Sequence, residues 1–257
     1  MNIFTIAWRQ VIYENKVFWR NPVAAFFTFV FPLMFLSISN LLFGNRLWDL
    51  PTGTVTGSTF YVPAVLVLAV VSTCYTNIAI RVSFSRDQGL LKRIHSTPMP
   101  VWSFLLGRIT HSVLLATLLV AIVTGFGVLL YDVHLPSNAL PSFLLTLIIG
   151  SATFSVLGLS ITTVIPNGDS SPAIVNASIL PLLFISDVLV PLQNAPAWLT
   201  TVANIFPVRH FALALHSSYN PLETGVGLEP LHLLVMILWL TMGLIITARF
   251  FSWSPKR

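Results

Sequence analysis

Long apolar runs separated by short polar segments constrain the fold of this chain most. A helix needs about 20 consecutive apolar residues to cross the hydrocarbon core of a bilayer. Six runs approach or exceed that length: Val23–Phe43, Phe60–Ile80, Val101–Leu130, Ser142–Ile165, Ala173–Val190 and Leu231–Phe251. Only 8% of the residues are charged, whereas soluble globular domains have roughly 25%. The sequence therefore predicts an all-α membrane protein with six transmembrane helices in one domain, residues 1–257.

Two further segments are apolar but do not fit a transmembrane helix. In residues 1–21 the apolar side chains recur every three to four positions, which indicates an amphipathic helix on the membrane surface. The alternative is the first helix of a soluble domain. Four prolines, at positions 191, 196, 207 and 221, divide residues 191–221 into pieces that are too short to cross. We expect a re-entrant helical hairpin there, on the extracytoplasmic side and before the last span.

The positions of the basic residues predict the orientation. If the N-terminus is cytoplasmic, all of the 13 Lys and Arg residues except Arg46 and Arg209 lie inside or at the inner boundary. Both termini are therefore predicted to be cytoplasmic. The net charge of +5 is scattered between apolar runs, a pattern that does not suit a nucleic-acid partner. Cys74 is the single cysteine, which excludes a disulfide within one chain and a CxxC-type metal site.

A polar segment, residues 81–100, separates the second run from the third. We expect a short helix in it that begins near Ser85 and ends before Thr97. Asp87 near its start and Lys92 and Arg93 near its end have the charge order that a helix dipole favours. Two interpretations stay open on spacing alone. The segment is either a docking surface for a soluble partner or an ordinary positive loop held near anionic lipid.

Polar residues inside the apolar runs are candidates for a substrate path, because such residues are costly in lipid. Asn77 and Asn176 fit either a path or hydrogen bonds between helices. Arg108 and His111 lie near the inner end of the third run, where we expect solvated boundary residues. The fourth run contains small residues that favour a close helix contact: Gly150, Ser151, Ala152, Ser155, Gly158 and Ser160.

Two other groups of residues have alternative interpretations. Asp187 precedes the region of residues 191–221 and Arg209 lies within it, so they fit either a paired outer gate or exposure at the lipid headgroups. Phe31 and Phe35 belong to an aromatic stripe in the first run. This stripe fits either an apolar lining for a lipophilic substrate or plain packing against helices and lipid.

The chain resembles the ABC-2 family of ABC-transporter permeases in two places. The cytoplasmic motif of that family is similar to Asp87-x-Gly89-Leu90-Leu91-Lys92-Arg93-Ile94-x-x-Thr97-Pro98, followed by Gly107-Arg108. The family's re-entrant region is similar to Pro196-Ala197-Trp198-Leu199 and Asn204-Ile205-Phe206-Pro207. Asp87 stands in place of the usual Glu, and Leu90 in place of Thr. Among subfamilies, the chain is most similar to the daunorubicin-type drug-exporter permeases.

The resemblance implies a half-transporter: two such membrane subunits, alike or different, with two cytosolic ABC ATPase subunits. ATP and magnesium would bind to the ATPase, and we expect no cofactor or metal on this chain. No GxxxxGK[ST] phosphate loop is present, so we expect no enzymatic activity of its own. The residues that would couple it to the ATPase are Asp87, Gly89, Leu91, Lys92, Arg93, Thr97 and Pro98.

The implied function is export of a lipophilic drug-like or lipid substrate across a bacterial inner membrane, as in multidrug efflux and antibiotic resistance. The first alternative is export of polysaccharide or lipid-linked glycan. A secondary transporter would normally show intramembrane charges near the midplane. An intramembrane serine protease would have to pair Ser155 or Ser160 with His111. The last alternative is a purely structural membrane subunit.

Overall fold

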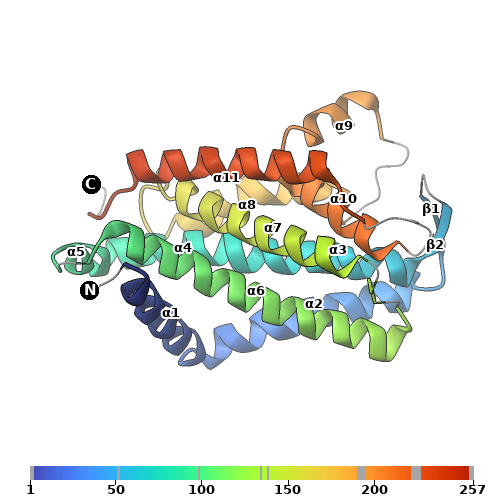
Figure 1. Cartoon of the computed structure of the whole chain (residues 1–257), viewed down its shortest axis with the longest axis horizontal. Helices are drawn as coiled ribbons and strands as arrows, with labels where there is room; N and C mark the ends of the chain where they lie inside the picture. Colours follow the sequence, from blue (N-terminus) through green and yellow to red (C-terminus); the bar gives the residue numbers. More distant parts are fainter. Residues whose placement is uncertain are drawn as a thin grey trace.

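The computed structural model describes residues 3–50, 53–97, 99–133, 135–137, 139–189, 195–220 and 227–254. These residues form an elongated bundle of helices that run along its long axis (Figure 1). Both termini and the short helix α5 (Leu90–His95) lie at one end of the bundle, which we call the terminal end. Strands β1 (Leu47–Leu50) and β2 (Gly53–Thr56) lie at the opposite end.

In the described part of the chain, five helical segments are long and apolar enough to cross a membrane: α2 (Pro22–Phe43), the continuous segment Gly57–Asp87, α6 (Val101–Tyr131), α7 (Leu140–Ile161) and α11 (Pro230–Phe250). They confirm the first, second, third, fourth and sixth predicted runs. α2 begins where expected, because Asn21 Oδ1 accepts a hydrogen bond from the Ala24 N–H at 3.1 Å and Pro22 occupies its first turn. Pro32 lies inside α2 without ending it.

The segment Gly57–Asp87 is the central element of the bundle. It consists of α3 (Gly57–Val71), a π-helical turn η1 (Ser72–Thr76) and α4 (Asn77–Asp87). It is buried on nearly all sides between α2, α6, α7 and α10 (Pro207–Tyr219). Apolar side chains therefore lie on all faces of this segment, whereas α2 and α11 each keep a broad exposed apolar face.

Two predictions of the transmembrane pattern need correction. The second run is longer than predicted at both ends, because the helix continues through the polar residues that we assigned to the following loop. The fifth predicted run, Ala173–Val190, appears as α8 (Ser171–Phe184), whose 14 residues are only about 21 Å long. A backbone turn with φ 56° at Asp187 follows it. Alone, α8 is shorter than the roughly 30 Å of a bilayer core.

The predicted loop after α2 contains a small antiparallel hairpin, so the described chain is not purely helical. Leu47 pairs with Thr56, and Leu50 with Gly53. The region of residues 191–221 contains two short helices, α9 (Ala197–Ala203) and α10, and the re-entrant hairpin expected there stays a prediction. Residues 191–194 and 221 lie outside the described part. α10 packs inside the bundle against α3, α7 and α11, whereas α9 projects from it (Figure 1).

Helix α1 (Ile3–Trp19) is amphipathic, as predicted, but its polar residues do not all face away from the protein. It packs against α6, and the buried face contains Gln10 and Glu14 beside Val11. Large apolar side chains, Phe4 and Trp8 among them, are exposed outside this face. Gln10 and Glu14 therefore lie among apolar residues on the face that meets α6, and the exposed surface of the helix is mixed, with Arg9 and Lys16 beside the aromatic residues.

Candidate functional site

The polar segment of residues 81–100, which we call the coupling segment after its predicted role, turns at one glycine between two helices. α4 ends at Asp87, and Gly89 adopts φ +71°, a left-handed conformation that favours glycine. The chain then turns into α5. The single helix predicted from Ser85 is therefore wrong. Asp87 lies at the C-terminal end of α4 and not at the start of a loop helix, so it does not complement a dipole as expected.

Helix α5 is fixed by one buried leucine and presents its basic residues outward. Leu91 is fully buried against Val82, Phe104 and Leu159. Lys92 and Arg93 are exposed and lie in the last turn, as predicted. We call α5 with these two side chains the coupling surface. Thr97 is also exposed and donates a hydrogen bond to the Ile94 carbonyl oxygen at 2.6 Å, whereas Pro98 lies outside the described residues.

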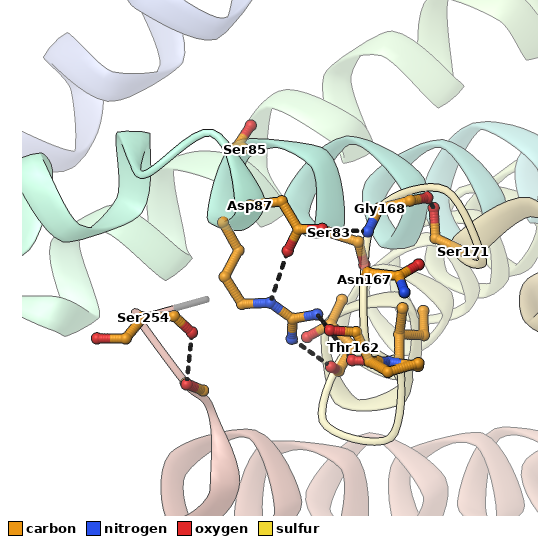
Figure 2. A network of polar contacts seen from close by, with 12 residues as sticks. Ser83, Ser85, Asp87, Thr162, Asn167, Gly168, Ser171 and Ser254 are labelled. Carbon is orange, nitrogen blue, oxygen red and sulfur yellow. Dashed lines mark hydrogen bonds and ion pairs between the residues drawn. The ribbon is translucent and has the colours of Figure 1, made fainter. Parts of the chain in front are cut away.

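A second polar turn is tied to the end of α4. Arg86 is buried, with Nη1 donating to the Thr162 carbonyl oxygen at 2.8 Å and Nη2 to the Ile165 carbonyl oxygen at 2.7 Å. The Asp87 carboxylate accepts a hydrogen bond from the Gly168 N–H, and Figure 2 shows Asp87 beside Gly168. We call these contacts the loop clamp. It joins the coupling segment to the turn between α7 and α8.

Arg86 is a site residue that sequence reasoning missed. It lies directly before the motif, which therefore assigns no role to it, and the predicted loop would have left it solvated. The signal in the sequence is an Arg-Asp pair directly after an apolar run, with a Pro-Asn-Gly turn later in the chain. A turn of this kind exposes carbonyl oxygens that a buried guanidinium can satisfy.

Asp187 and Arg209 are brought together. Arg209 Nε donates to Asp187 Oδ2 at 3.1 Å, and both side chains are largely buried. Arg209 Nη1 also donates to the Thr200 carbonyl oxygen at 3.0 Å and to Asn204 Oδ1 at 2.9 Å. The arginine thus joins α9, α10 and the turn after α8. Their role as an outer gate stays a prediction.

The four proposed path residues do not form one group. Phe31 and Asn77 line the same cavity of about 260 Å³ between α2 and the central segment. Phe35 is partly buried and packs against the main hydrophobic core. Asn176 is exposed on α8.

Arg108 and His111 are buried, so the expectation that they are solvated boundary residues is wrong. Arg108 Nε donates to Glu14 Oε1 at 2.8 Å, and Gln10 Nε2 donates to the same oxygen at 2.9 Å. His111 is only 7% exposed. The ion pair joins α1 to α6 about two turns inside α6. It was missed because Glu14 fits the solvated face of an isolated amphipathic helix.

The sequence was compared with known protein families. Residues 1–219 match the family described as ABC-2 type transporter. This match covers most of the chain. The chain belongs to the ABC-2 type transporter family.

Several curated permeases are similar to this permease at low identity. It is 24% identical over 152 residues to the probable multidrug ABC transporter permease YbhR of Escherichia coli K12, covering 59% of this chain and 41% of YbhR. It is 24% identical over 206 residues to the putative transport permease ycf38 of Porphyra purpurea, covering 79% of this chain and 69% of that protein. It is 28% identical over 196 residues to ycf38 of Cyanophora paradoxa, covering 74% of this chain and 66% of that protein. The chain thus spans less than half the length of YbhR.

Membership of this family makes the chain a multi-pass membrane permease and not an ATPase, because the ABC-2 domain has no nucleotide-binding motif. The serine-protease alternative also lacks its catalytic pair. Ser155 Oγ donates to the Ser151 carbonyl oxygen at 2.7 Å, and Ser160 Oγ to the Leu157 carbonyl oxygen at 2.9 Å. Within the described residues of the permease, neither serine is hydrogen-bonded to His111.

Proposed function

We propose that this permease is the transmembrane subunit of an ATP-driven exporter of the daunorubicin type, moving a lipophilic drug-like or lipid substrate outward across a bacterial inner membrane. A separate cytosolic ABC ATPase would bind ATP and magnesium, and a second permease subunit, alike or different, would complete the membrane part. The family match and the similarity to YbhR, described as a probable multidrug permease, support this function.

The proposed topology has six spans, with α8 as a short fifth span and α9 with α10 as the extracytoplasmic re-entrant region. Both termini would be cytoplasmic. The common position of the two termini and α5 at the terminal end supports this arrangement (Figure 1). α1 would lie at the membrane surface, with its exposed Phe4 and Trp8 in lipid.

The coupling surface is the observation that carries the proposal. Lys92 and Arg93 point away from the bundle, while the buried Leu91 holds α5 against α4 and α6. The loop clamp connects the same region to the turn between α7 and α8. An ATPase that pushes on α5 would therefore move several spanning helices together, as a rigid-body exporter requires.

An apolar substrate is favoured over a glycan by the lining of the cavity beside α2. Its walls include Phe27, Phe31, Pro32 and Ala69, and most of the exposed wall is apolar, although Thr28, Ser72, Thr73 and Asn77 also line it. A path for glycan would need polar and aromatic residues that hydrogen-bond and stack on sugars along its length.

The test is co-purification of the tagged permease with an ABC ATPase from detergent, followed by an ATPase assay. Reversal of charge in the double variant Lys92→Glu/Arg93→Glu should abolish capture of the ATPase, because a like charge at a docking surface costs several kcal/mol. The matched control is Lys16→Glu/Arg20→Glu, which reverses two exposed basic residues of and after α1. Equal capture by all three proteins would contradict the proposed docking surface.

A further inference from the structure

A polar hollow beside the Glu14–Arg108 pair holds more positive charge than that pair balances. Its lining includes Glu14, Asn77, Arg81, Arg108 and His111. Glu14 is the acidic residue there, and it already accepts from Arg108 at 2.8 Å. Arg81 is partly buried, and within the described residues its guanidinium has neither an ion pair nor a hydrogen bond. Glu14 interacts electrostatically with Arg81 as well as with Arg108, so one carboxylate faces two guanidinium groups and the hollow is short of one negative charge.

His111 adds a second unsatisfied group to the same hollow. Its side chain is more than nine-tenths buried, and Nε2 has no hydrogen-bond partner in the described part of the chain. Buried polar groups normally have a partner. An anion placed between Arg81 and His111 would supply acceptors to both side chains.

The polar hollow adjoins the apolar cavity that Phe31 and Asn77 line. Thr73, in the π-helical turn η1, and Asn77, directly after it, line both spaces. The cavity has a volume of about 260 Å³. Phe27 and Phe31 at its wall are 61% and 46% exposed, so the cavity opens at the surface between α2 and the central segment. A cationic end and an open apolar end therefore meet at one π-helical turn, a feature that often marks functional sites.

We propose that the hollow and the cavity together bind an anionic amphiphile. The hollow has a volume of about 20 Å³, so one oxygen of the phosphate or carboxylate group enters it and lies against Arg81 and His111, where a guanidinium offers paired donors. Its apolar body fills the cavity and continues into the bilayer. The single unbalanced positive charge of the hollow matches a headgroup with one negative charge. A zwitterionic headgroup would also bring a positive charge to a site that already has an excess of positive charge. Binding does not depend on the ATPase, so its failure would leave the proposed export function standing.

The experiment measures the melting temperature of the full permease in a neutral detergent. Dioctanoyl phosphatidylglycerol is titrated against dioctanoyl phosphatidylcholine, which has the same chains and no net charge. Phosphatidylglycerol should raise the melting temperature in a saturable way and bind about tenfold more tightly than phosphatidylcholine. The reason is that its charge-assisted hydrogen bond to the partly buried arginine is not offset by a positive charge in the same headgroup. Equal affinity for both lipids overturns the proposal.

Variants locate the two halves of the site. Arg81→Gln should weaken phosphatidylglycerol binding about tenfold, Arg81→Lys should retain most of it, and Arg249→Gln, at an exposed arginine in the last turn of α11, should leave it unchanged. Ala24→Trp, which fills the apolar cavity from α2, should also weaken the lipid. Native affinity in Arg81→Gln would overturn the proposal. If that variant does not fold, the comparison of the two lipids on the native chain and the Ala24→Trp result decide.

A last arm separates a lipid headgroup from free phosphate. Inorganic phosphate at constant ionic strength should raise the melting temperature far less than phosphatidylglycerol, because it leaves the cavity unfilled. Phosphate that stabilises the permease as strongly as the lipid, with the same dependence on Arg81, would overturn the amphiphile and leave a simple anion site.

Discussion

Arg209 is the residue on which the geometry after α8 depends. It donates to Asp187, to the Thr200 carbonyl oxygen and to Asn204, so that one side chain joins three segments. Asp187 contributes a backbone turn with φ 56° as well as its carboxylate. The two residues are therefore not equivalent partners in a simple ion pair.

We predict that the charge-swapped variant Asp187→Arg/Arg209→Asp is not rescued. An aspartate at position 209 would face the Thr200 carbonyl oxygen, which is also an acceptor, and an arginine at position 187 would have to adopt a positive φ. We expect Arg209→Ala to lower the free energy of unfolding by about 2 kcal/mol, and the charge-swapped variant to lower it by at least as much. Thermal unfolding and export of the two single variants and the double variant check this. Native stability in the swapped protein would mean that the pair acts through charge alone.

At the residue scale, the sequence was informative wherever the environment follows from local pattern. Exposure of Lys92 and Arg93 follows from their place after a buried leucine in a short helix. The burial of Glu14 and Arg86 could not be predicted, because their partners are 94 and 76 residues away in the chain. Only the docking of α1 on α6, and of α4 on the turn after α7, makes burial of those charges possible.

At the element scale, the close approach of α7 to the central segment rests on small side chains. A Cβ atom at Gly158 would lie 2.7 Å from the Tyr75 carbonyl oxygen of the central segment, and one at Gly150 would lie 2.3 Å from Phe211 Cε2 of α10, which α7 also approaches closely. The predicted contact face of the fourth run is thereby confirmed. Backbone approach of this kind is common between helices in lipid.

A matched pair of glycine variants tests this contact. Gly158→Ala should destabilise the permease by about 1–3 kcal/mol, because the methyl group meets a backbone atom that cannot move aside. Gly125→Ala, in α6, has no heavy atom within 4 Å of the new carbon and should be neutral or stabilising by up to about 1 kcal/mol. Melting temperatures in one detergent give the comparison. Equal effects of the two variants would show that helix propensity, and not the contact, decides.

The elements were predictable to the extent that hydropathy determines them. Five spans follow from long apolar runs, since lipid leaves a helix as the only way to satisfy the backbone of a single segment. The end of α8 at Phe184 and the hairpin of β1 and β2 did not follow. The residues after Phe184 are apolar enough to fit a longer helix, and the residues of the hairpin also fit an open loop. In both places the structure depends on a few backbone angles that composition does not determine.

At the scale of the whole molecule, the loop clamp makes the terminal end a single unit. It links the central segment, through Arg86 and Asp87, to the turn between α7 and α8. α7 in turn packs along α11, whose following residues reach α5, where the Trp253 and His95 ring centroids are 5.0 Å apart. Force applied to α5 is therefore shared among at least three spanning segments.

We predict that Arg86→Ala separates ATP hydrolysis from export. The variant leaves the Thr162 and Ile165 carbonyl oxygens without their donors, which should cost about 2 kcal/mol and lower the melting temperature by about 4–8 °C. α5 and its exposed basic residues stay in place, so the ATPase should still bind and hydrolyse ATP. Arg249→Ala is the control at an exposed arginine. Parallel loss of hydrolysis and export in Arg86→Ala would contradict a separate role for the clamp.

The π-helical turn at Ser72–Thr76 gives the central segment a property that an uninterrupted helix lacks. Such a turn takes up one residue more than an α-helical turn, and each residue of an α-helix corresponds to about 100° of rotation. Conversion of this turn to α-helical pairing would therefore screw α4 by about that angle relative to α3, and α5 would swing with it. A rotation of α4 at the terminal end is therefore coupled, through this turn, to a change in how α3 and α4 pack against their neighbouring helices.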